Sequence, residues 1–182
     1  MNSQERRAAA DRILREKGLL SRLEEIGRPH IIGSYRMDMM AWNDLDIDVE
    51  NDEMTMDKLY ALTEFVLKTF QPVWYEAKQE QNEQGENVWF HGFETMQDGQ
   101  LWNVDLWFFN RRTIEQAEAY CDGVAHRADA AQRQAILDIK TELIARGLYS
   151  FEQFKSMDVY QAVLDQGVRD VESFLKRFGK KN

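Results

Sequence analysis

The sequence predicts an α+β fold, a mixed β-sheet flanked by helices, with a helical subdomain at the C-terminal end. Strand-like and helix-like patterns succeed each other over the first two-thirds of the chain, whereas helical spacing of apolar residues dominates after Arg111-Arg112. A chain of 182 residues, 43% of them hydrophobic, is also long enough to bury a sizeable core. We therefore expect a sheet-containing core with an N-terminal helix over residues 1–111 and a helical subdomain over residues 112–182.

The elements of the core follow from apolar spacing and from the residues that interrupt it. The expected elements are, in order, a helix over residues 4–25, a strand over residues 30–32, a helix over residues 56–70 and a strand over residues 73–79. Gly18 is expected to interrupt the first helix, and Pro72 ends the second because proline cannot continue a helix.

Two further strands, over residues 88–95 and 101–109, flank an Asp98-Gly99 pair. Asp-Gly between two strands is the strongest short signal for a β-hairpin, because both residues tolerate the positive φ angles of a tight turn. The expected register pairs Gln97 with Gln100, Glu94 with Asn103, and Gly92 with Asp105.

Composition limits the expected partners and location. The net charge of −9 and the pI near 4.9 argue against non-specific binding to nucleic acid, so a polynucleotide partner is not expected. The single cysteine, Cys121, excludes an internal disulfide and favours a reducing, cytoplasmic setting. No signal-peptide core or membrane-spanning run is evident, so no membrane partner is expected. The oligomeric state is not indicated.

Residues 44–49 read Asp-Leu-Asp-Ile-Asp-Val, the most informative segment of the chain. Strict alternation predicts a β-strand, whose alternate side chains share a face, so Asp44, Asp46 and Asp48 would form an acidic row. Neighbouring carboxylates repel one another unless a cation neutralises them. Oxygen ligands favour a hard divalent ion, Mg²⁺ or Mn²⁺.

Two simpler interpretations compete with a metal site. A calcium-binding EF-hand loop would need glycine at its sixth position and glutamate at its twelfth, where this chain has Val49 and Thr55. A solvated edge strand, kept acidic to prevent aggregation, is the stronger alternative. Two other features favour the metal site. Gly33-Ser34 follows a short apolar strand, as a phosphate-binding turn would, and Asp105 is a lone carboxylate in an apolar strand, where a charge is costly without a partner.

Together these residues resemble the active-site signature of the nucleotidyltransferase superfamily, which includes DNA polymerase beta and the antibiotic nucleotidyltransferases. That signature is a hydrophobic residue and Gly-Ser, roughly ten residues, an Asp-hydrophobic-Asp pair, and a third carboxylate on a later strand. Here Ile32-Gly33-Ser34 supplies the turn, Asp44 and Asp46 the pair, and Asp105 the third member. The resemblance covers roughly residues 31–109 and implies a polymerase-beta-like nucleotidyltransferase core.

The resemblance also implies roles for these residues. Asp44, Asp46 and Asp105 would be catalytic and would hold two Mg²⁺ or Mn²⁺ ions, with Asp105 beside the acceptor hydroxyl as a metal ligand or general base. Gly33, Ser34 and Arg36 would bind the triphosphate of a nucleoside triphosphate such as ATP. The third aspartate of the row leaves two registers open, Asp44 with Asp46 or Asp46 with Asp48; the spacing from the Gly-Ser turn favours the first.

Other polar and aromatic side chains are weaker candidates for the site. The hairpin register puts His91 on the sheet face opposite Asp105 and puts Glu94 and Trp107 on the same face as Asp105. Trp107 would be either a core residue, like the other tryptophans, or a ring on which a base could stack. Glu76 and Lys78 alternate on a strand; they would line the cleft or form a surface ion pair.

The expected protein is thus a metal-dependent nucleotidyltransferase, which transfers a nucleoside monophosphate from a nucleoside triphosphate to a hydroxyl of an acceptor by a two-metal mechanism. The acidic charge favours a small-molecule acceptor, for example a cationic one. The alternative is a catalytically inactive relative that binds a nucleotide or a partner protein.

Overall fold

The computed structural model describes residues 1–51, 53–82, 85–150 and 153–179. It divides into two compact units, Met1–Cys121 and Asp122–Asn182, and the predicted α+β class is confirmed. The division falls inside helix α5 (Arg111–Arg127), so the domain boundary expected at residue 111 stays a prediction. Among the described residues, no helix combines the length and apolar character needed to cross a membrane.

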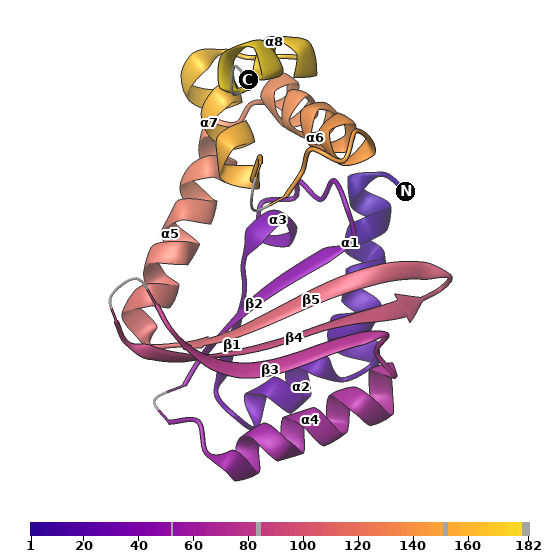
Figure 1. Cartoon of the computed structure of the whole chain (residues 1–182), viewed down its shortest axis with the longest axis vertical. Helices are drawn as coiled ribbons and strands as arrows, with labels where there is room; N and C mark the ends of the chain where they lie inside the picture. The colour runs from indigo at the N-terminus through magenta and orange to yellow at the C-terminus, as the bar shows by residue number, and fades with distance from the viewer. Residues whose placement is uncertain (52, 83–84, 151–152, 180–182) are drawn as a thin grey trace. The chain divides into compact units, whose positions relative to one another are not determined.

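The first unit is built on a five-stranded mixed sheet (Figure 1). The strands follow the spatial order β1 (Arg28–Ile31), β2 (Asp44–Glu50), β5 (Gln100–Phe109), β4 (Asn87–Gln97) and β3 (Trp74–Gln81). β2 and β5 are parallel, and the other neighbouring pairs are antiparallel. The last strand of the sheet in sequence, β5, therefore lies in its centre, between β2 and β4.

The helices of this unit agree closely with the apolar spacing. They are α1 (Ser3–Asp11), a π-helical stretch η1 (Arg12–Glu16), α2 (Leu19–Glu24), the single turn α3 (Gly33–Arg36) and α4 (Met56–Phe70). The expected interruption is found at Gly18, whose φ of +76° is a left-handed conformation that glycine adopts without strain. Thr55 begins α4 by accepting a hydrogen bond from the Lys58 N–H.

The hairpin has the register that the Asp-Gly turn predicts. Gln97 pairs with Gln100, Glu94 with Asn103, and Gly92 with Asp105. Asp98 and Gly99 both have positive φ, +50° and +72°, as the two central residues of a tight hairpin turn require. This register determines which β5 side chains share a face with Asp105.

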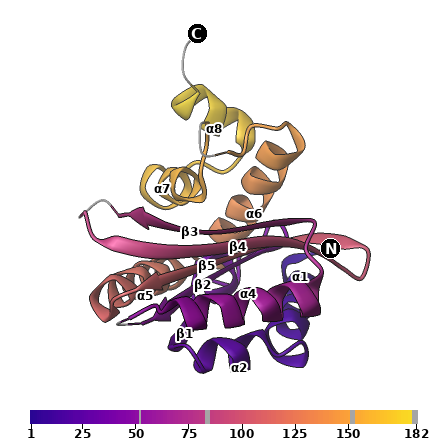
Figure 2. The ribbon, with the colours of Figure 1, turned by 60° about the horizontal axis from the view of Figure 1, so that its bottom comes forward.

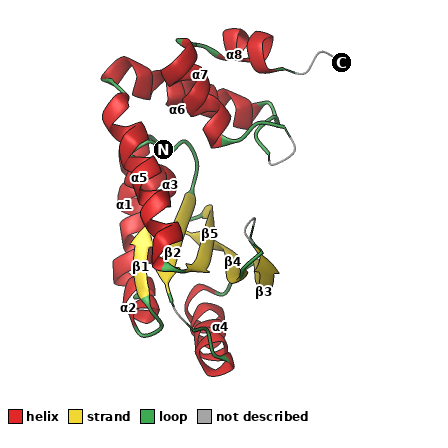
Figure 3. Cartoon of the chain, turned by 90° about the vertical axis from the view of Figure 1, so that its left-hand side faces the viewer, coloured by secondary structure: helices red, strands yellow, loops and turns green. Residues whose placement is uncertain are grey.

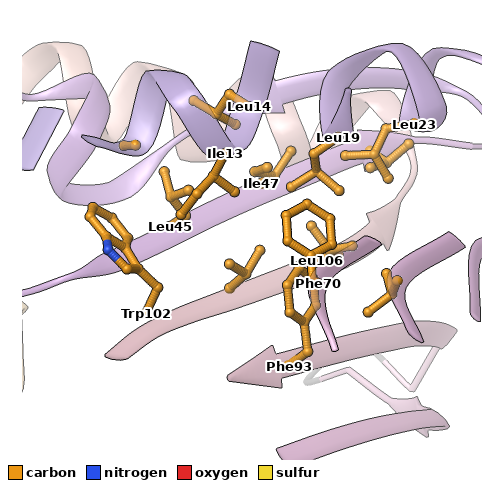
Figure 4. Packing of buried hydrophobic residues seen from close by; sticks show 14 of the residues in the cluster. Ile13, Leu14, Leu19, Leu23, Leu45, Ile47, Phe70, Phe93, Trp102 and Leu106 are labelled. Carbon is orange, nitrogen blue, oxygen red and sulfur yellow. The ribbon is translucent and has the colours of Figure 1, made fainter. Parts of the chain in front are cut away.

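One face of the sheet packs against α1, α2 and α4, which lie together beneath it in Figure 2. Alternate residues of β5, including Trp102, Val104 and Leu106, are fully buried on this face. They meet apolar side chains of the helices, such as Ile13, Leu23 and Phe70 (Figure 4). Burying this surface is the main stabilising term, about 1.5–3 kcal/mol for each large apolar side chain. We call it the core face.

The second unit is helical, in contrast to the first (Figure 3). It consists of the end of α5 together with α6 (Ala130–Ala145), α7 (Ser156–Gln166) and α8 (Val171–Phe178). Its core includes Phe174, which contacts the rings of Phe154 and Phe178 with both centroids 5.0 Å away. The prediction of helices in the last third is confirmed.

Candidate active site

The other face of the sheet carries the acidic row. Because β2 alternates, Leu45, Ile47 and Val49 are fully buried on the core face, which leaves the three aspartates on the opposite face. The parallel register then places Asp46 directly beside Asp105 of β5. The site thus joins two strands that are distant in sequence, and we call this surface the site face.

Three carboxylates gather there. Asp44, Asp46 and Asp105 are half-buried, and each offers one oxygen such that these oxygens all lie within 4.8 Å of one another. Asn103 Nδ2 donates a hydrogen bond to Asp44 Oδ1 at 2.9 Å. Burial raises the pKa of the Asp105 carboxyl, the hydrogen bond from Asn103 opposes this shift, and the charge of Glu94 adds to it. Such a group is costly to keep charged without a cation.

The Gly-Ser turn lies against this group. Gly33 has a φ of +62°, and a Cβ at this position would come 2.0 Å from Asp46 Oδ2, so only glycine lets the turn approach the carboxylate so closely. The hydroxyl of Ser34 is buried and has no hydrogen-bond partner among the described residues. A buried hydroxyl without a partner costs free energy in the empty protein, which a ligand oxygen would recover.

Asp48 lies outside the carboxylate group. It is 2% exposed and pairs with His30 of β1 and Trp107 of β5 in the ladder. Burial raises the pKa of its carboxyl to about 7, and the charges of Asp46 and Glu118 add to this effect. Of the two registers left open by the sequence, the geometry gathers Asp44 with Asp46. That these residues bind metal stays a prediction.

Arg36, expected to bind the triphosphate, ends the α3 turn and forms an ion pair that the sequence did not reveal. Its Nη1 donates to Glu118 Oε1 of α5 at 2.8 Å, and the same oxygen lies 3.1 Å from His30 Nδ1. Arg36 lines a pocket of about 390 Å³ together with Arg7 and Arg28. None of the three clustered carboxylates lines this pocket. No local pattern could reveal this contact, because Arg36 and Glu118 are 82 residues apart in sequence.

The weaker candidates separate by face as the register predicts. His91 is fully buried on the core face against the ring of Tyr75, and burial lowers its pKa to about 4, so it is a neutral structural residue. Trp107 and the partly exposed Glu94 lie on the site face. Glu76 and Lys78 form an ion pair with a distance of 3.3 Å, the simpler of the two expectations for them.

Comparison with known proteins supports the fold. No family model matches the chain, and no curated protein matches it in sequence. Among solved structures, Cid1 poly(U) polymerase with Mg and 3′-dATP bound has a TM-score of 0.57 and 21% identity, covering 89% of this chain and 48% of its own. The same polymerase with MgGTP bound has a TM-score of 0.60 and 16% identity, with coverages of 88% and 50%.

A cytoplasmic RNA terminal U-transferase also matches, with a TM-score of 0.54 and 22% identity, over 89% of this chain and 47% of its own. The chain thus spans about half the length of these structures. The expected resemblance to the nucleotidyltransferase superfamily is confirmed at the level of the fold, and the chain has the polymerase-beta-like nucleotidyltransferase fold.

The expectation of a small-molecule acceptor in place of a polynucleotide is contradicted by these neighbours, which are a poly(U) polymerase and an RNA terminal U-transferase. The reasoning failed because net charge averages over the whole surface. The total of −9 shows neither that a bound cation would neutralise the three clustered carboxylates nor that three arginines converge on the 390 Å³ pocket near α3.

Proposed function

We propose that this protein is a metal-dependent nucleotidyltransferase, which transfers a nucleoside monophosphate from a nucleoside triphosphate to a hydroxyl at the end of an RNA strand. The observation that carries the proposal is the gathering of Asp44, Asp46 and Asp105 beside the Gly33-Ser34 turn, on a fold shared with RNA-extending enzymes. A carboxylate cluster alone is common on protein surfaces; its combination with this turn and this fold is not.

The residues present fit divalent cations. Three carboxylate oxygens within 4.8 Å of one another are a donor set suited to Mg²⁺ or Mn²⁺. Asp44 and Asp46 would hold both ions, and Asp105 would hold the one nearer the acceptor. Bound there, such ions would neutralise the negative charge that develops on the phosphorus being attacked and on the leaving pyrophosphate.

The protein groups would position the two substrates. The hydroxyl of Ser34, buried and without a hydrogen-bond partner in the described part of the chain, would donate to a triphosphate oxygen, and the Gly33 backbone leaves room for that approach. Asp105 would accept the proton of the acceptor hydroxyl, and its burial-raised pKa supports this role because it brings the carboxylate closer to the range of a general base. The acceptor oxygen then bonds to the α-phosphorus as pyrophosphate leaves.

The test is an extension assay. The protein is incubated with a 5′-labelled single-stranded oligoribonucleotide, each nucleoside triphosphate in turn, and Mg²⁺ or Mn²⁺, and the product lengths are resolved by electrophoresis. We expect addition of at least one nucleotide, lost with EDTA and with Asp46→Asn. If none of the nucleotides is added while Mn²⁺-dependent nucleotide binding persists in calorimetry, the protein is a binding module and the proposed transfer is wrong.

A further inference from the structure

Aromatic rings lie near Asp105 on its own strand and on β4 and β3. Four residues of the site face contribute them: Trp74 of β3, Phe90 of β4, and Trp107 and Phe109 of β5. None of these rings belongs to the hydrophobic cluster of the core face. They therefore lie on the face that carries the carboxylates, and we call them the ring platform.

The rings contact one another in a definite order along the sheet. Trp107 and Phe109 are stacked, with an interplanar angle of 4° and centroids 5.5 Å apart, and Phe90 lies 4.7 Å from Trp107 across the strand pair. Gly92, the cross-strand partner of Asp105, makes room for this arrangement. A Cβ there would come 2.4 Å from Phe90 Cζ and 3.1 Å from Trp74 Cζ3. The platform thus reaches the ladder position next to Asp105.

The spacing suits a nucleotide whose sugar hydroxyl is at Asp105. Trp107 is two residues further along β5, about 7 Å at roughly 3.4 Å per residue. In a nucleotide, the base and its own 3′ hydroxyl are separated by a similar distance. The stack formed by Phe109 and Trp107 ends at Trp107 on β5, while the ring of Phe90 on β4 reaches Gly92, the ladder partner of Asp105. A flat base would stack on the partly exposed ring of Trp107, with its sugar at Asp105.

The charges on this face disfavour binding of an RNA strand through its phosphate backbone. Among the described cations of this face, Lys78 of β3 lies 3.3 Å from Glu76 and 3.4 Å from Glu80, and others, such as Arg28, lie at the β1 edge. Arg36 also lies at the β1 edge, where it is paired with Glu118 beside His30. Around Asp105 the neighbouring polar groups are Asp46, Glu94 and Asn103. Phosphates of an RNA strand would gain little there, whereas stacking of a base on an aromatic ring does not depend on charge.

We propose that the ring platform, with Trp107 at its centre, binds the terminal base of the acceptor strand by stacking and so brings the terminal hydroxyl to Asp105. This inference rests on the proposed function and specifies how the protein binds the RNA acceptor. It predicts an acceptor recognised at its last nucleotide, with a shallow salt dependence of binding, unlike nucleic-acid binding through rows of lysine and arginine.

The test is a double-mutant cycle that measures binding in the absence of nucleotide transfer. One change is in the protein, and the other is the removal of the terminal base of the strand. A labelled oligoribonucleotide and the same strand with an abasic 3′-terminal ribose are titrated with wild-type protein and Trp107→Leu by fluorescence anisotropy. We expect Trp107→Leu to weaken binding of the intact strand about 5- to 150-fold and to leave the abasic strand nearly unchanged. Trp107→Phe, which keeps a ring, should recover most of the loss, and the logarithm of the dissociation constant should change little with salt.

Two controls separate the outcomes. Tyr60→Leu removes an aromatic side chain that is 63% exposed on α4, on the core-face side, and should change neither strand. Arg28→Gln tests whether the RNA strand is bound through its phosphates. The stacking proposal would be overturned if Trp107→Leu weakened binding of both strands equally. It would also be overturned if binding depended steeply on salt and Arg28→Gln reduced that dependence. These binding results are independent of the extension assay. If nucleotides are transferred but the effects of Trp107→Leu and of removing the terminal base are additive, the ring platform alone is refuted. If no nucleotide is transferred, the proposed function is refuted.

Discussion

The two faces of the sheet place different demands on the same strands. On β5, Trp102, Val104, Leu106 and Phe108 point into the core, while Asn103, Asp105, Trp107 and Phe109 alternate with them on the site face. The core face contributes stability through apolar burial. The site face collects like charges, a close-packed glycine and a buried hydroxyl that has no hydrogen-bond partner among the residues described, and each of these costs stability in the empty protein. Substitutions on the core face should therefore lower stability, whereas substitutions on the site face should lower transfer activity more than stability.

The sharpest separation is expected for Asp46→Asn on the site face. Loss of a central carboxylate should lower transfer at least about 1,000-fold, because several kcal/mol of charge stabilisation are lost. Stability without metal should be unchanged or slightly higher, because repulsion with Asp105 is relieved. Extension assays and urea unfolding measure the two quantities. A clear loss of stability would mean that Asp46 is a structural residue.

The matching change on the core face is Leu106→Ala, at the position next to Asp105. Leu106 is fully buried in the core, so its truncation should cost about 2–5 kcal/mol of unfolding free energy. Protein that remains folded should still bind nucleotide and metal. Denaturant midpoints provide the measurement, and a cost below about 1 kcal/mol would show that the two faces differ less than their burial suggests.

The two faces also carry buried ionisable groups with opposite pH dependence. Burial lowers the pKa of His91 from 6.5 to about 4, so the unfolded chain binds the proton more readily, and stability should fall by about 3 kcal/mol as pH falls through this window. Asp48, with its pKa raised to about 7, acts in the opposite sense, since its neutral form is favoured in the folded protein.

Comparing the pH dependence of stability of the wild type and of His91→Leu, both in the presence of EDTA, isolates the contribution of the histidine. The difference in unfolding free energy between wild type and this variant should change by about 3 kcal/mol between pH 7 and pH 4. A pH-independent difference would show that His91 is not buried as a neutral group.

The smallest expected effect comes from Gly33→Ala. The added Cβ would be strained at a φ of +62° and would push Asp46 away, at about 1–2 kcal/mol for the backbone alone. Transfer should fall about 10- to 100-fold, while the core face is untouched. Gly99→Ala, at the exposed hairpin tip with a φ of +72° and open space for a Cβ, is the matched control: it has the same backbone strain but should retain activity.

Local patterns predicted most of this fold because they are determined by neighbouring residues. The alternation of residues 44–49, the spacing in α4 and the Asp98-Gly99 turn each depend on a few consecutive side chains, and the turn determined the register that placed His91 and Trp107 on opposite faces. The convergence of Asp105 on Asp44 and Asp46 required the resemblance to a known signature. The parallel pairing of β2 with β5 leaves no local trace.

The sequence could not reveal contacts between distant elements or the distribution of charge. The ion pair of Arg36 with Glu118 joins α3 to α5, and neither segment indicates the other. The wrong expectation about the acceptor has the same origin. A total of −9 does not show which carboxylates would be neutralised by cations or which face of the molecule an RNA strand would meet.

The central position of β5 has a consequence for synthesis on the ribosome. When β1 to β4 have emerged, β2 and β4 still lack the neighbour that separates them in the finished sheet, and Asp44 and Asp46 have no third carboxylate. Domains tend to fold as units during translation, and unpaired strand edges favour aggregation. A nascent chain stalled before Gln100 should therefore be aggregation-prone and should lack the third carboxylate of the proposed metal site, so that this site would form in one late step rather than gradually.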